Sequence, residues 1–233
     1  MLGRVAYLKT SLLDFPGRLA SVLFLSGCDF RCPYCHNAAL VDERRADAED
    51  GFVPLEEFFA YLDKRKSLIS GVVISGGEPL LHEETPAIAA AIRERGLAVK
   101  LDTNGSYPER IAEVGADYVA LDLKTSSAAY GRVAPGFASA GEKALESLLY
   151  LRSSATPFEI RVTCAPGIVG PFELEALSLT FESRDEVLLQ EFRPGRCLDP
   201  AFDMVEPYTR AEMESLLEIA KKRVPKARVR GWR

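Results

Sequence analysis

Six short apolar segments alternate along this chain with segments that carry apolar residues at helical spacing. The apolar segments are residues 21–27, 71–77, 98–105, 117–124, 158–167 and 186–192. The helical segments between and after them are residues 54–66, 84–96, 108–115, 141–153, 171–181 and 209–223. Continuous apolar strands that alternate with helices are typical of a parallel sheet covered by helices. The pattern therefore predicts an α/β fold.

The number of these units predicts an incomplete barrel. Right-handed βα units in strict order favour a TIM-like barrel, and a full barrel of eight units typically needs about 250 residues. Because the chain has 233 residues and six units, we expect a partial, open (β/α)6 barrel with parallel strands. No linker or repeat divides residues 1–233, so a single domain is expected. It would have an N-terminal segment (1–20) and a basic C-terminal tail or strand (221–233).

Charge and hydropathy argue against several classes of protein. A net charge of −5 argues against a nucleic-acid-binding surface. No apolar run reaches the roughly 18 residues of a membrane span, and the N-terminal residues show no signal-peptide pattern. Five cysteines, unevenly placed, are too few for a disulfide scaffold. We therefore expect a cytoplasmic protein that binds neither nucleic acid nor membranes.

Three of the five cysteines lie within eight residues, in the stretch GCDFRCPYCHNA (residues 27–38). Thiolates as close in sequence as Cys28, Cys32 and Cys35 can share one metal centre. Zinc usually takes four ligands, and His36 is a candidate for the fourth. A 4Fe-4S cluster normally takes four thiolates, so three would leave one iron open to a substrate. The residues themselves leave both kinds of centre open.

Polar residues fall at the C-terminal ends of the predicted strands, where a parallel barrel carries its active site. The second strand ends in SGGEP, in which Gly76 and Gly77 have no Cβ and allow close approach of a ligand. Glu78 offers a charge-assisted bond to an ammonium group. The next three strand ends add Asp102, Thr103 and Asn104, then Asp122 and Lys124, and then Arg161. We expect these acids and bases to surround one mouth.

The spacing CxxxCxxC with Tyr34 before the last cysteine, followed by GGEP, resembles the radical S-adenosylmethionine superfamily. The resemblance implies that Cys28, Cys32 and Cys35 hold one 4Fe-4S cluster and that S-adenosylmethionine chelates its fourth iron. The reduced cluster would cleave the sulfonium to methionine and a 5′-deoxyadenosyl radical. Tyr34 would lie against the adenine, with ordinary packing as the alternative. Gly76, Gly77 and Glu78 would receive the methionyl amine.

The stretches LDTNG and LDLK resemble the corresponding stretches of pyruvate formate-lyase activating enzymes. The resemblance implies that Asp102, Asp122 and Lys124 contact the ribose and carboxylate region of S-adenosylmethionine and a nearby monovalent cation. It carries over to Thr103, Asn104 and Arg161 as members of the same cofactor-binding set.

Two further stretches, residues 11–28 (SLLDFPGRLASVLFLSGC) and 192–200 (FRPGRCLDP), resemble activating proteins of glycyl radical enzymes. They are most similar to the long form of the activating proteins of anaerobic ribonucleoside-triphosphate reductases. This implies a glycyl radical enzyme as protein substrate and a flavodoxin- or ferredoxin-type electron donor. Residues 36–75 contain no cysteine, so one cluster is expected. Gln190, Glu191 and Phe192 replace the Pro-aromatic-His of many activases, which weakens a pyruvate formate-lyase assignment.

Two alternatives stay open at the level of the sequence. One is a radical S-adenosylmethionine enzyme that acts on a small molecule, in the manner of a deazapurine synthase. The other is a non-enzymatic zinc module in which the cysteines brace a loop. The two distant cysteines, Cys164 and Cys197, are expected to be structural, because a buried cysteine behaves as a small apolar residue.

Overall fold

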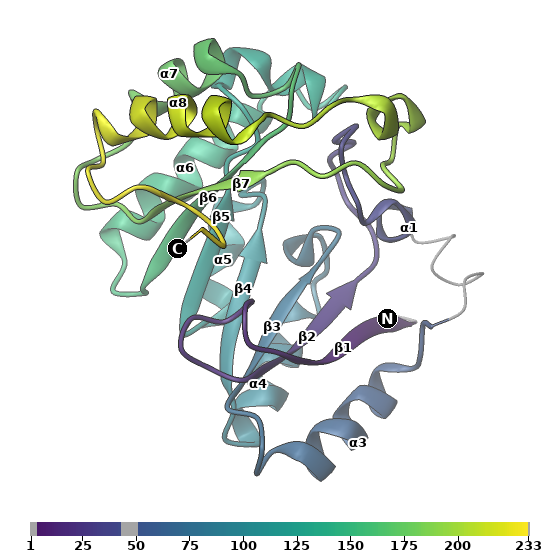
Figure 1. Cartoon of the computed structure of the whole chain (residues 1–233). Coiled ribbons are helices and arrows are strands. Elements are labelled where there is room, and N and C mark those ends of the chain that lie inside the picture. The colour runs from purple at the N-terminus through teal and green to yellow at the C-terminus, as the bar shows by residue number, and fades with distance from the viewer. Residues whose placement is uncertain (1–3, 43–50, 233) are drawn as a thin grey trace.

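The computed structural model describes residues 4–42 and 51–232, which form one eight-stranded sheet in chain order (Figure 1). Its strands are β1 (Val5–Ser11), β2 (Ala20–Leu25), β3 (Gly71–Gly76), β4 (Ala98–Thr103), β5 (Tyr118–Asp122), β6 (Phe158–Cys164), β7 (Val187–Glu191) and β8 (Arg228–Val229). β1 is antiparallel to β2, and every later neighbour is parallel. The predicted partial barrel with parallel strands is confirmed, and its six predicted strands are β2 to β7.

Helices fill the crossovers between the parallel strands. They are α1 (Ala38–Val41), α3 (Leu55–Arg65), α4 (Thr85–Glu94), α5 (Pro108–Val114), α6 (Ala140–Ser153), α7 (Pro171–Ser178) and α8 (Arg210–Lys221). Short 3-10 turns are η1 (Pro79–Leu81), η2 (Ser127–Arg132) and η3 (Pro200–Met204). Local sequence explains several ends: Gly115 closes α5 at a φ of 58°, and Thr209 and Glu212 form a capping box on α8. None of the described helices is both long and apolar enough to cross a bilayer.

Side chains of the central strands divide between two faces, as the period of two in a strand requires. Val99, Leu101 and Leu121 belong to the main apolar core, which also contains residues of the surrounding helices. The opposite face of β4, β5 and β6 carries five charged residues among its alternate positions: Lys100, Asp102, Asp122, Glu159 and Arg161. The inner face of the partial barrel is therefore strongly polar at its centre.

The two ends of the sheet approach each other through side chains. In the described residues the strand order runs from β1 to β8 without a backbone pairing that would close the circle. Arg230, just after β8, donates to the Leu13 carbonyl and the Asp14 carboxylate, each at 3.0 Å. It also donates to the Gln190 amide oxygen at 2.9 Å. One arginine thus bridges the first loop and the last strands of the open barrel.

Both terminal segments contribute a strand to the sheet. The N-terminal segment (1–20) contains β1, which pairs along β2 and also forms a bridge through Val5 to Val53. β1 begins with the apolar run VAYL, but its residues are mostly half-buried or exposed, unlike those of β2 and β3. The basic segment (221–233) holds the end of α8 and then β8, so part of it is a last strand. Residues 1–3 and Arg233 lie outside the described residues.

Candidate active site

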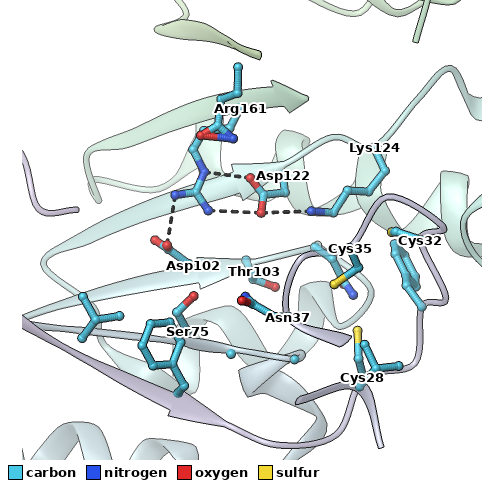
Figure 2. Close-up of a pocket in the computed structure, with 18 of the residues that line it drawn as sticks. Cys28, Cys32, Cys35, Asn37, Ser75, Asp102, Thr103, Asp122, Lys124 and Arg161 are labelled. Carbon is cyan, nitrogen blue, oxygen red and sulfur yellow. Dashed lines mark hydrogen bonds and ion pairs between the residues drawn. The ribbon is translucent and has the colours of Figure 1, made fainter. Parts of the chain in front are cut away.

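The cysteine loop follows β2 and is held by backbone hydrogen bonds from two sides. Gly27 donates to the Leu40 carbonyl at 2.7 Å, and Leu198 donates to the Cys35 carbonyl at 3.0 Å. The thiols of Cys28, Cys32 and Cys35 line one cavity of about 300 Å³ (Figure 2). The loop therefore presents all three predicted ligands to a common space.

The same cavity collects residues from successive strand ends. It is lined by predicted residues Gly76, Gly77, Asp102, Thr103, Asn104, Asp122, Lys124 and Arg161, together with the three cysteines. It is also lined by Asp14, Asn37, Ser75, Gln190 and Arg230, which the sequence analysis did not propose as site residues. Tyr34 and Glu78 are not among the lining residues. The expected mouth at the C-terminal ends of the parallel strands is thus present, and all the proposed residues except Tyr34 and Glu78 line it.

Gly76 and Gly77 have a structural reason to be glycine that does not depend on a ligand. A Cβ on Gly76, whose φ is 128°, would lie 2.1 Å from the Leu25 carbonyl oxygen. A Cβ on Gly77 would lie 1.9 Å from the Gly27 carbonyl oxygen. The backbone here packs directly against the start of the cysteine loop, and the Glu78 amide donates to the Gly27 carbonyl at 2.8 Å. The glycines therefore set the position of that loop.

Replacing Gly77 with alanine is expected to lower the free energy of unfolding by about 3 kcal/mol, because backbone must move to admit the methyl group. The cysteine loop would move with it, so iron uptake should also fall. Urea unfolding and iron analysis measure both effects. Gly131→Ala is the matched control, since a Cβ there meets nothing within 4 Å. Equal stability of the two variants would contradict the packing role.

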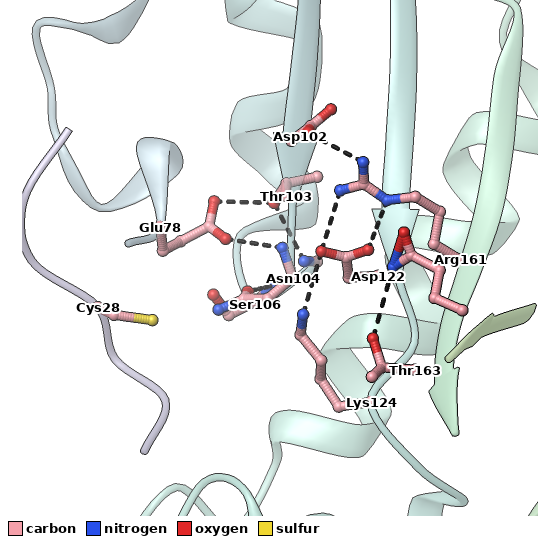
Figure 3. A network of polar contacts seen from close by, with 12 residues as sticks. Cys28, Glu78, Asp102, Thr103, Asn104, Ser106, Asp122, Lys124, Arg161 and Thr163 are labelled. Carbon is pink, nitrogen blue, oxygen red and sulfur yellow. Dashed lines mark hydrogen bonds and ion pairs between the residues drawn. The ribbon is translucent and has the colours of Figure 1, made fainter. Parts of the chain in front are cut away.

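Glu78 is fully buried, and its carboxylate is already occupied by three protein donors. It accepts from the Thr103 hydroxyl at 2.8 Å and the Asn104 amide at 2.7 Å (Figure 3). It also accepts from the Leu80 amide at 3.0 Å. These bonds fasten the end of β3 to the end of β4. The expected contact of Glu78 with a ligand amine stays a prediction, whereas its role in joining two strand ends is visible.

The buried position of Glu78 predicts a pH dependence of stability. Burial raises the pKa of this carboxyl to about 7. Between its ordinary value of 4.5 and about 7, the folded chain retains a proton that the unfolded chain releases, so this group's contribution to stability falls as pH rises. From pH 5 to 7, the stability of the wild type relative to Glu78→Gln should fall by about 2–3 kcal/mol. Urea unfolding of the cluster-free proteins measures this, and a constant difference across that range would contradict it.

Tyr34 packs in the protein core behind the cysteine loop. Its side chain is 7% exposed, and its hydroxyl is among the buried atoms that have no hydrogen-bond partner. Burial raises the pKa of that hydroxyl well above its ordinary value. The structure thus shows the packing alternative, and contact with an adenine ring stays a prediction.

An ion network crosses the polar face of the barrel beside the cavity (Figure 3). Arg161 donates to Asp122 at 2.7 and 3.1 Å and to Asp102 at 3.0 Å. Lys124 donates to Asp122 at 3.1 Å. Burial by itself would raise the pKa of Asp122, but Arg161 and Lys124 outweigh it and hold this pKa below its ordinary value. Both carboxylates are therefore fixed as anions by side chains of the protein.

Sequence reasoning missed two further members of this network. Lys100 donates to Asp102 at 2.6 Å, and its ammonium lies 3.6 Å from the Glu159 carboxylate. The signal for each was a charged residue inside an otherwise apolar strand. Lys100 lies two positions before Asp102, and Glu159 lies two positions before Arg161, so each shares a strand face with a residue already proposed. Asp29 was missed as well, and it accepts from the Asn104 amide group at 2.9 Å.

The donor set fits an iron–sulfur cluster better than zinc. Burial raises the pKa of Cys32 to about 11 and also raises the pKa values of Cys28 and Cys35, so a metal must displace their protons. Across residues 4–42 and 51–232, no three histidine, cysteine, aspartate or glutamate side chains gather closely enough to hold one metal ion. His36 instead contacts the Arg193 carbonyl and stacks on Phe192 at 6.0 Å. The zinc alternative thus lacks its fourth ligand.

A model of the Radical SAM superfamily matches residues 22–171, the span that contains the cysteine loop and the strand ends from β2 to β6. This chain belongs to the Radical SAM superfamily. The identification confirms that it is an enzyme, and it overturns the zinc-module alternative. Enzymes of this superfamily use a 4Fe-4S cluster and S-adenosylmethionine, which agrees with three thiols around a cavity lined by acids and bases.

Relatives of this Radical SAM protein include enzymes of the activating branch. A protein of Methanocaldococcus jannaschii named "Putative glycyl-radical enzyme activating enzyme" is 31% identical over 94% of this chain and 92% of its own. A pyruvate formate-lyase-activating enzyme of Clostridium pasteurianum is 33% identical over 53% of each chain. A 7-carboxy-7-deazaguanine synthase of Methanopyrus kandleri is 31% identical over 48% of this chain and 52% of its own. The resemblance to the activating branch is therefore confirmed.

Solved structures support the fold of this Radical SAM protein. SuiB of Streptococcus suis has a TM-score of 0.64 at 15% identity, over 88% of this chain and 47% of that one. At this identity the likeness concerns the fold alone.

Proposed function

We propose that this protein activates a glycyl radical enzyme by removing a hydrogen atom from a glycine Cα of that partner. The observation that carries the proposal is the similarity to an activating-enzyme relative along nearly the whole of both chains. The stretch DFPG before β2 adds support, because its Asp14 lines the same cavity as the cysteines. No backbone pairing among the described residues closes the barrel between β1 and β8, and a loop of a protein substrate would enter on that side.

The cofactors would supply a one-electron cleavage of S-adenosylmethionine that yields a 5′-deoxyadenosyl radical. The protein would hold the cluster through Cys28, Cys32 and Cys35, and would hold S-adenosylmethionine through the strand-end residues. Lys124 would pair with the methionyl carboxylate, because its ammonium lies between Asp122 and the cysteine loop (Figure 2). Arg161 would orient Asp122 and Asp102, and the backbone of residues 75–77 would accept from the amine.

The reacting bond in the partner would be a glycine Cα–H bond. The hydrogen atom would pass to the 5′ carbon and give 5′-deoxyadenosine, and the unpaired electron would stay on the Cα. Flanking amide groups stabilise that radical, so the transfer is downhill. Because the cavity volume is about 300 Å³, a glycine loop would have to enter with no bulky side chain at the reacting position.

More specifically, the partner would be an anaerobic ribonucleoside-triphosphate reductase. A flavodoxin- or ferredoxin-type protein would donate the electron, and the reaction would take place in the cytoplasm. This assignment rests on the stretches DFPG and FRPGRCLDP. The stretch FRPGRCLDP contacts the cysteine loop, since the backbone amide of Asp199 donates to the Pro33 carbonyl at 3.0 Å. A small-molecule substrate is the competing proposal, supported by the partial match to a deazaguanine synthase.

The test combines the reduced, cluster-loaded protein, S-adenosylmethionine and a purified anaerobic ribonucleotide reductase under anaerobic conditions. We expect a glycyl radical signal in the electron paramagnetic resonance spectrum of the reductase, with one 5′-deoxyadenosine formed per radical. A reductase in which the radical glycine is replaced by alanine is the control. 5′-Deoxyadenosine without any glycyl radical, in this reductase or other glycyl radical enzymes, would favour the small-molecule alternative.

A further inference from the structure

The ion network extends below the cavity and alternates in charge from one end to the other. Glu159 lies 3.6 Å from Lys100, Lys100 lies 2.6 Å from Asp102, and Asp102 lies 3.0 Å from Arg161. Arg161 then contacts Asp122 at 2.7 Å, and Asp122 contacts Lys124 at 3.1 Å. The three acids and three bases of this network therefore balance to a net charge of zero.

Each carboxylate oxygen that would hold a monovalent cation already pairs with a cationic side chain of the protein. One oxygen of Asp102 accepts from Lys100 and the other from Arg161. One oxygen of Asp122 accepts from Arg161, and the other accepts from both Arg161 and Lys124. A cation that approached these oxygens would meet an ammonium or a guanidinium at each of them. The cation expected from the sequence therefore does not fit this arrangement.

The charge balance leads to the same result. An added cation would leave one uncompensated positive charge beside side chains that are 1% exposed for Lys100 and 7% exposed for Arg161. Burying an unpaired charge is costly, because the protein interior solvates it much less than water does. Side-chain cations of the protein, and not a bound ion, neutralise the negative charge of Asp102 and Asp122.

We propose that Lys100 supplies the positive charge at the S-adenosylmethionine site that a bound monovalent cation would otherwise provide, so that S-adenosylmethionine binding is independent of such an ion. An ammonium group is a compact point charge, and Lys100 places it on the Asp102 oxygen that Arg161 leaves free. Glu159 holds the ammonium in place from the other side. The proposal rests on the S-adenosylmethionine binding of the proposed function and is independent of the partner.

The test measures S-adenosylmethionine affinity without any partner protein. Cluster-loaded wild type is titrated with S-adenosylmethionine in sodium, potassium or tetramethylammonium chloride at constant ionic strength. Binding is followed by calorimetry and by the change in the electron paramagnetic resonance spectrum of the reduced cluster. We expect dissociation constants within about twofold of one another. Lys100→Met should bind at least about tenfold more weakly in tetramethylammonium and regain affinity in potassium or sodium.

Two further variants keep the test decisive. Lys100→Met combined with Glu159→Gln removes the buried carboxylate that the single change would leave with the Tyr118 hydroxyl but without a cationic partner, and it should show the same recovery by potassium or sodium. Lys143→Met, on the exposed surface of α6, should behave as wild type.

Wild-type affinity that falls about tenfold or more in tetramethylammonium would overturn the proposal. Folded Lys100 variants with no response to the ion would overturn it too. Wild type that binds no S-adenosylmethionine in any salt would overturn the proposed function as well, so the two failures are distinguishable.

Discussion

Replacing Cys32 with alanine is expected to abolish cluster binding and to reduce 5′-deoxyadenosine formation by at least about a thousandfold. Cys32 is the most buried of the three thiols that line the cavity. The two remaining thiolates cannot retain a cluster that normally needs at least three protein ligands and a chelating substrate. Iron and sulfide analysis, visible absorbance and chromatographic assay of 5′-deoxyadenosine measure the loss.

Cys164→Ala is the matched control for this change. Cys164 is also buried and free, but it lies on the outward face of β6 with the apolar core and does not line the cavity. We expect that variant to lose about 1 kcal/mol of stability while it retains its iron and its activity. A Cys32 variant that bound iron and formed 5′-deoxyadenosine like this control would refute the assignment of the cluster ligands.

Replacing Arg161 with methionine is expected to lower the free energy of unfolding by about 3–5 kcal/mol, because two buried carboxylates lose their shared partner. Arg161 makes three hydrogen bonds to Asp102 and Asp122, and its side chain is 7% exposed. Urea unfolding of the cluster-free protein measures the change. Arg161→Lys should also be destabilised, since an ammonium cannot reproduce the planar fork of a guanidinium.

Arg132→Met is the matched control for Arg161. Arg132 also pairs with a carboxylate, that of Glu173 at 2.8 Å, but half of its side chain is exposed to solvent. Exposed pairs contribute about 0–1 kcal/mol, so this variant should be almost as stable as the wild type. If Arg161→Met were equally mild, the network would not be a determinant of the fold.

The sequence predicted the parallel strands well because each is a compact apolar run with a helix on either side. The predicted strand at 71–77 is β3 at Gly71–Gly76, and the predicted helix at 171–181 is α7 at Pro171–Ser178. The strand ends could then be placed at one mouth, because the C-terminal ends of parallel strands share one edge. This topological rule predicts from the sequence alone that the cysteine loop lies close to residues of β3 to β6.

Other features could not be predicted because they depend on contacts across the sheet. β1 carries only the short apolar run VAYL, and it lies in the sheet through its antiparallel pairing with β2. In the sequence, Lys100 is a single charge within an apolar strand, and its contact with Glu159 of β6 follows only from the fold. The motif of Glu78 indicated a ligand contact, which stays a prediction, but it did not indicate the hydrogen bonds from Thr103 and from the backbone around it. Motif and position thus predict which residues gather, but not which of them contact each other.

The bridge between Arg230 and Asp14 has a consequence for how this protein folds. It joins residues 216 positions apart, whereas the sheet grows in chain order and each strand can pair with its predecessor. Contacts of such large separation form late, since loop-closure entropy must be overcome first. Removing the bridge should therefore speed unfolding more than it slows folding. During synthesis on a ribosome, the cavity would acquire its last lining residue only after β8 has emerged.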